Sequence, residues 1–110
     1  MNHIKSDSGT TNTIKEYDNR GNEIYRRDSD GVESWREYDE NNNEIHCRYS
    51  NGAEFWWEYD ANNNEIHYRN SKGFEVWSEY DENNNLLHLR DSSGYEYWYD
   101  EKRNPHTTLV

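Results

Sequence analysis

The sequence predicts an all-β protein, an antiparallel meander of 21-residue β-hairpin repeats that form one twisted, elongated sheet. The first observation behind this prediction is a strict repeat, because the tripeptide Glu-Tyr-Asp begins at Glu16, Glu37, Glu58 and Glu79. Tryptophan and glycine recur with the same step of 21 residues, at Trp35, Trp56, Trp77, Trp98, Gly31, Gly52, Gly73 and Gly94. The second observation is the alternation of aromatic or aliphatic with polar residues inside each repeat, which is typical of strands.

The domain organisation follows from where the repeat begins and degrades. The chain has 110 residues, the length of a single domain. Residues 1–15 are predicted to be a polar N-terminal arm, and residues 16–110 to be the repeat domain. The last repeat is degenerate from about residue 95, because Trp98 is followed by Tyr99-Asp100 without the complete tripeptide. Only 30% of the residues are hydrophobic but 15% are aromatic, which indicates a folded protein with little conventional core.

Each repeat contains two predicted strands, which gives about eight or nine strands in all when they are counted over the chain. In residues 44–49, strict alternation places Glu44, His46 and Arg48 on one face of the sheet. In residues 53–59, the same face receives Glu54, Trp56 and Glu58. The opposite face is predicted to be apolar, with Tyr38, Tyr59, Tyr80, Ile45, Ile66, Leu87, Val32, Phe55, Trp57, Phe74, Val76, Tyr95 and Tyr97.

Two kinds of turn join the predicted strands. Segments such as Ser50-Asn51-Gly52 suit a type I turn followed by a left-handed residue, and this register places Arg48 opposite Glu54 and His46 opposite Trp56. The other turn holds three asparagines in a row. Its middle position is Gly21 in the first copy and asparagine in the later copies, which predicts a positive φ there.

The pattern Gly-x-Glu-x-Trp-x-Glu-Tyr-Asp-x-Asn-Asn-Asn-Glu-Ile resembles the YD repeat of RHS-type proteins, over roughly residues 16–100. The resemblance implies a spiralling β-sheet, which in that family often forms the shell of a large secreted toxin. This chain differs from the family in its small size and in its tryptophans, which stand where the family often has tyrosine. The resemblance therefore implies the fold more than the function.

Nothing in the sequence predicts an enzyme, a metal site or a cofactor. His46, His67 and His88 share one register, but equivalent strands lie about 10 Å apart, too far for one zinc ion. No nucleophile recurs beside a base, and there is no phosphate-binding glycine loop. The arginines of the repeats are instead expected to pair with glutamates across strands and to stack on tryptophan.

The strongest functional signal is charge, because 23 acidic residues against 12 basic ones give a formal net charge of −11. An acidic edge repels nucleic acid and attracts basic protein grooves, although net charge also serves solubility alone. The residues predicted to bind a partner combine the acidic turns, the glutamate ladder and the apolar face: Asp39, Glu40, Asp60, Asp81, Glu82, Glu54, Glu75, Phe55, Trp57 and Phe74.

Two function classes follow from these features. The first is a non-enzymatic inhibitor that occludes a basic nucleic-acid-handling protein, such as a nuclease or a CRISPR effector, without binding nucleic acid itself. The alternative is a structural or carbohydrate-binding YD-repeat module that acts through its Trp and Tyr faces. The apolar face also predicts a homodimer. The chain shows no secretory signal and no membrane-spanning stretch, so a cytoplasmic protein is expected.

Overall fold

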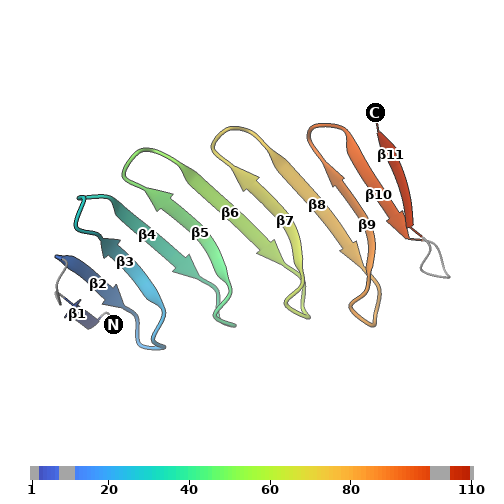
Figure 1. Ribbon diagram of the computed structural model, residues 1–110. Helices are drawn as coiled ribbons and strands as arrows, with labels where there is room; N and C mark the ends of the chain where they lie inside the picture. Colours follow the sequence, from blue (N-terminus) through green and yellow to red (C-terminus); the bar gives the residue numbers. More distant parts are fainter. Residues whose placement is uncertain (1–2, 8–11, 100–104, 110) are drawn as a thin grey trace. The chain divides into compact units, whose positions relative to one another are not determined.

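The computed structural model describes residues 3–7, 12–99 and 105–109, and within them every regular element is a β-strand (Figure 1). The chain divides into two compact units, Met1–Phe55 and Trp56–Val110, and each is described by itself. The described residues form eleven strands: β1 His3–Asp7, β2 Thr13–Tyr17, β3 Glu23–Arg27, β4 Glu33–Tyr38, β5 Glu44–Tyr49, β6 Glu54–Tyr59, β7 Glu65–Asn70, β8 Glu75–Tyr80, β9 Leu86–Asp91, β10 Tyr95–Tyr99 and β11 Pro105–Leu109.

The predicted antiparallel meander is confirmed, since strands that follow one another in the chain are neighbours in the sheet. Strands β2 to β10 correspond to the predicted repeat strands, and β1 and β11 are additional. Residues 1–15, predicted to be an arm, contain β1 and the beginning of β2, which pair from His3↔Tyr17 to Asp7↔Thr13. None of the described residues belongs to a helix of the length and apolarity needed to cross a membrane.

Both kinds of turn have the same backbone geometry. In the glycine turn, the amide of Gly31 donates to the carbonyl of Asp28 at 3.0 Å, and Gly31 has a φ of 86°. In the asparagine turn, the amide of Asn42 donates to the carbonyl of Asp39 at 3.1 Å, and Asn42 has a φ of 66°. Both are three-residue hairpin loops that end in a left-handed residue. The predicted positive φ is thus confirmed, also for Gly21 at 85°.

The predicted cross-strand register is confirmed in the repeats where it is described. Arginine lies opposite glutamate in three hairpins, and histidine lies opposite tryptophan in two: Arg27↔Glu33, Arg69↔Glu75, Arg90↔Glu96, His67↔Trp77 and His88↔Trp98. The glycine turn sets this register, because its length fixes which residues face one another.

The predicted face of Glu44 is wrong. The pairing of β4 with β5 passes from Glu37↔His46 directly to Tyr38↔Glu44, so one extra residue sits in β5 as a β-bulge. The bulge interrupts the alternation of side chains, and a carboxylate oxygen of Glu44 lies 3.5 Å from Nε of Arg36. Glu44 and His46, predicted to share a face, therefore contact different partners on different faces.

The sheet has almost no conventional core. Among the described residues, only Cys47 and Ser34 are buried, at 2% and 3% exposure, and no large side chain is fully buried. Burial raises the pKa of the Cys47 thiol, which favours its neutral form within the sheet. The stability of each unit thus rests on turns and on contacts between neighbouring strands.

Candidate protein-binding surface

The aspartate that opens each asparagine turn holds that turn together. One carboxylate oxygen of Asp39 accepts hydrogen bonds from the amides of Asn41 and Asn43, at 2.8 and 2.9 Å. The other accepts from the side chain of Asn43 at 3.3 Å. Asp60 and Asp81 repeat these contacts. The backbone hydrogen bond from Asn43 is the main cause that lowers the pKa of Asp39, so this carboxylate stays charged while it closes the turn.

Asparagine side chains also link one turn to the next. In the first unit, Nδ2 of Asn22 donates to Oδ1 of Asn42 at 2.9 Å. In the second unit, Asn64 donates to Asn84 at 2.8 Å. The middle asparagine thus supplies both the left-handed backbone and an acceptor, whereas the last one donates to its own aspartate and to the neighbouring turn. Sequence reasoning identified only the backbone role of these residues.

Acidic side chains gather at this edge of each unit. We call the acidic edge the set of Glu37, Asp39, Glu40, Glu58, Asp60, Glu79, Asp81 and Glu82. Three of its glutamates are highly exposed, Glu37 at 69%, Glu58 at 68% and Glu79 at 72% of the side chain. The segments 37–47, 58–68 and 79–89 contain no lysine or arginine.

Three arginines of the repeats lie toward the opposite end of the strands, where they cover tryptophan rings. The guanidinium carbon of Arg48 lies 4.1 Å from the ring centroid of Trp35. The same distance is 4.0 Å for Arg69 on Trp56 and 4.3 Å for Arg90 on Trp77. Three positive charges are thus stacked on aromatic rings at one end of the strands. At the other end, Arg20 donates to the carbonyls of Glu40 and Asp39 at 2.8 and 2.9 Å, while Glu37, Glu58 and Glu79 stay highly exposed.

Each histidine of the repeats lies between two carboxylates on neighbouring strands. His46 contacts Glu37 through Nδ1 and Glu54 through Nε2, both at 2.8 Å. His88 contacts Glu79 at 3.0 Å and Glu96 at 2.9 Å, and stacks on Trp98 with ring centroids 3.7 Å apart.

His67 has the equivalent contacts with Glu58, at 3.6 Å, and with Glu75, at 2.9 Å. Glu54 and Glu75, predicted to bind a partner, thus contact histidines of this protein, and 31% of each glutamate side chain is exposed. Among the described residues, no group of three or more side chains is arranged to hold a metal ion.

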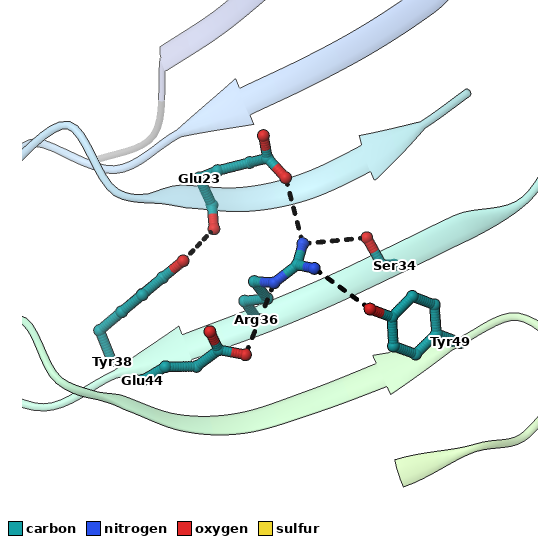
Figure 2. Close-up of polar contacts among 6 residues, drawn as sticks. All are labelled: Glu23, Ser34, Arg36, Tyr38, Glu44 and Tyr49. Atoms are coloured by element: carbon teal, nitrogen blue, oxygen red, sulfur yellow. Dashed lines mark hydrogen bonds and ion pairs between the residues drawn. The ribbon is translucent and has the colours of Figure 1, made fainter. Parts of the chain in front are cut away.

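In the first unit, the face predicted to be apolar carries a polar network around Arg36 (Figure 2). Its guanidinium lies 3.1 Å from the carboxylate of Glu23, donates to Ser34 at 3.1 Å and donates to the hydroxyl of Tyr49 at 3.3 Å. The carboxylate of Glu44, 3.5 Å from Nε of Arg36, is the second acidic partner of this guanidinium. Sequence reasoning missed this network, although the position of Arg36 holds another cation, Lys15, in the preceding copy and Trp57 and Ser78 in later ones.

The three apolar residues predicted to bind a partner lie in different environments. Phe55 packs edge-to-face on Tyr49 with centroids 6.0 Å apart, and Trp57 packs on Tyr68 at 5.9 Å. Both are half-buried, whereas Phe74 in a turn is 37% exposed.

The first unit also contains a hollow of about 590 Å³ on the described surface. Its lining mixes aromatic, acidic and basic side chains: Asp18, Ile24, Trp35, Arg36, Glu37, Tyr38, His46 and Arg48. Because Arg48 already stacks on Trp35 there, one face of that ring is not open to a sugar.

Comparison with known proteins supports the fold and not a function. No family model matches the chain, and no similar sequence is found among characterised proteins. The crystal structure of TcdB2-TccC3-Cdc42 is similar in fold, with a TM-score of 0.69 at 14% identity over 82% of this chain. That of TcdB2-TccC3-TEV has a TM-score of 0.53 at 12% identity over the same share.

The chain spans only 5% and 6% of the length of these two proteins. Both comparisons agree with the β-sheet fold that the sequence predicts. At this identity the likeness concerns the fold alone.

Proposed function

We propose that this protein is a non-enzymatic acidic binding protein that occupies the cationic surface of a nucleic-acid-handling protein and thereby inhibits it. A nuclease or a CRISPR effector is the kind of partner that this surface fits. The observation that carries the proposal is the separation of charge along the strands. The segments 37–47, 58–68 and 79–89 at the acidic edge contain no arginine or lysine, whereas Arg48, Arg69 and Arg90 stack on tryptophans. Arg20 reaches this edge from the neighbouring turn, where it donates to the backbone carbonyls of Asp39 and Glu40 and leaves their carboxylates in place.

The acidic edge is also well ordered for binding. The turn aspartates are fixed by three hydrogen bonds each, and Glu37 and Glu79 are oriented by histidine. Equivalent turns in one unit are two strands apart, which corresponds to about 10 Å. Carboxylates held in such a row lose little conformational freedom on binding and steer a basic groove toward the protein.

The test is competition for a nuclease with a basic DNA-binding groove. Purified nuclease is loaded with a fluorescent DNA duplex, and displacement of the duplex by this protein is followed by anisotropy at several salt concentrations. Displacement of the duplex that weakens as the salt concentration rises supports the proposal. The proposal is contradicted if the duplex stays bound at every protein concentration for a panel of such nucleases and CRISPR effectors.

The variants for this test are dictated by the turns. Reversing the charge of Asp39, Asp60 or Asp81 would break the turn itself, so Glu40→Lys is the suitable change. Its matched control is Asp30→Lys, an equal charge reversal on an exposed residue of a glycine turn. Glu40→Lys should weaken displacement several-fold more than Asp30→Lys, and equal effects would mean that only net charge matters.

A second candidate function is a structural YD-repeat module, which is favoured by the fold likeness to TcdB2-TccC3. This function predicts self-association through exposed apolar residues such as Val32 and Phe74. Light scattering tests this self-association, because a mass near 13.4 kDa at micromolar concentration contradicts a homodimer. A flat response to a panel of glycans would exclude the carbohydrate-binding form of this function.

A further inference from the structure

We propose that the ring of Trp98 is a binding site for an arginine side chain of a protein partner. This inference rests on the proposed function, since it names the group on a cationic partner that the protein would hold. The argument begins with the other tryptophans of the same register. Trp35, Trp56 and Trp77 each have a guanidinium 4.0 to 4.3 Å from the ring centroid, so the fold itself demonstrates the contact three times.

The sheet register explains why Trp98 is different. Arg48 lies directly across from Trp35, and Arg90 lies across from Trp77. The residue across from Trp98 is His106, so the position that supplies the guanidinium in those two hairpins holds another residue here. In the part of the chain that the structure describes, no guanidinium lies over Trp98.

The ring of Trp98 is held by a stacked histidine and keeps a large exposed surface. The imidazole of His88 stacks on the ring with an interplanar angle of 16°, and His88 is in turn held by Glu79 and Glu96. The residue nevertheless remains 42% exposed, the highest value among the tryptophans. An oriented and partly exposed indole suits a planar cation.

The occupant is identified by chemistry as arginine rather than lysine or a sugar. A guanidinium stacks flat on an indole and keeps its N–H groups free for carboxylates, which an ammonium does less well. The three internal examples all use arginine, although the sequence also contains lysine. The net charge of −11 favours a cation over any neutral ligand.

The direct test uses blocked Gly-Arg-Gly as the probe and the five indole N–H signals of the full-length protein in an NMR titration. The Trp98 signal should move furthest, and blocked Gly-Lys-Gly should move it less. Trp98→Ala should remove the saturable response of the protein, whereas Trp57→Phe, a change on the other face, should leave the Trp98 response intact. Equal shifts of all five signals, or none, would overturn the inference.

The inhibition assay then separates this inference from the proposed function. With a nuclease that the protein displaces from DNA, Trp98→Ala should reduce the affinity at least about threefold, as expected for one exposed cation–π contact. If Glu40→Lys weakens binding but Trp98→Ala leaves it unchanged, the proposed function stands and the arginine site is refuted. If neither protein nor peptide binding is detected, both fail.

Discussion

The two units contain the same hairpins but fill one face of the sheet differently. In the first unit Arg36 joins Glu23 and Glu44 in a network that includes Ser34 and Tyr49. In the second unit the positions equivalent to Arg36 hold Trp57 and Ser78, and those equivalent to Glu23 and Glu44 hold Glu65 and Leu86. The turns and strand pairing repeat regardless, so the backbone of this fold is specified by turns and register rather than by what covers the face.

This difference has an electrostatic consequence. Desolvation by neighbouring atoms raises the pKa of Glu65, although the residue as a whole remains exposed, so the shift concerns only part of its carboxyl surface. Glu23, by contrast, has the guanidinium of Arg36 at 3.1 Å. The first unit therefore compensates its carboxylates on this face, and the second unit leaves one in a less favourable setting.

The largest effect is expected from acid, and it should affect both units alike. Hydrogen bonds lower the pKa of Asp18 and Asp39 in the first unit and of Asp60 and Asp91 in the second. Because the folded pKa lies below the unfolded one, their stabilisation is present above about pH 4 and is lost as the pH falls through the folded pKa. Far-UV circular dichroism should show loss of the sheet below about pH 3, and an unchanged spectrum at pH 2 would contradict this.

The next largest effect is expected from Arg36→Ala, which removes the network from the first unit only. Glu23 and Glu44 lose their guanidinium while 22% and 32% of their side chains remain exposed. The free energy of unfolding should fall by about 2 kcal/mol, as for a half-buried charged hydrogen-bond network. Urea denaturation measures it, with Arg26→Ala, an exposed residue of β3, as the control. A loss no greater than that of the control would show that the network contributes nothing.

A smaller effect is expected at the asparagine turn of the second unit. Asn84→Ala forces a left-handed backbone on alanine and removes the acceptor of Asn64, and should cost about 1–2 kcal/mol. Asn84→Gly removes only the acceptor and should cost less than about 1 kcal/mol. The same urea assay separates the cost of the strained backbone from the cost of the lost hydrogen bond. An equal loss in both variants would mean that the hydrogen bond between turns, and not the backbone, is decisive.

The smallest effect is expected when the second unit is made to resemble the first. Ser78→Arg places a guanidinium at the position from which Arg36 reaches Glu23, and should bring the pKa of Glu65 down. Glu65→Gln should slightly stabilise the protein at pH 7. Because the folded pKa of Glu65 is raised, that gain should vanish as the pH falls through it. NMR titration of the Glu65 carboxyl measures the shift, and an unchanged pKa in Ser78→Arg would show that the two faces are not equivalent.

The sequence was sufficient for the repeat, the turns and the register, because these depend on local rules. A position filled by Gly21 or Asn42 has few conformations to choose from, and a three-residue loop fixes Arg27 opposite Glu33. The face of Glu44 could not be predicted, because alternation assigns faces to odd and even positions and does not reveal where a bulge adds a residue. The Arg36 network depends on that bulge and was missed for the same reason. The additional strands β1 and β11 lie outside the repeat, where periodicity gives no signal.

The near absence of buried residues has a consequence for how such a protein changes over time. Since only Cys47 and Ser34 are buried among the described residues, a repeat contributes mainly to its neighbours on either side. Gain or loss of one 21-residue segment would thus lengthen or shorten the sheet without disturbing a shared interior. Each added copy would add one turn to the acidic edge, so the number of repeats would set the number of ordered turn carboxylates that the protein presents.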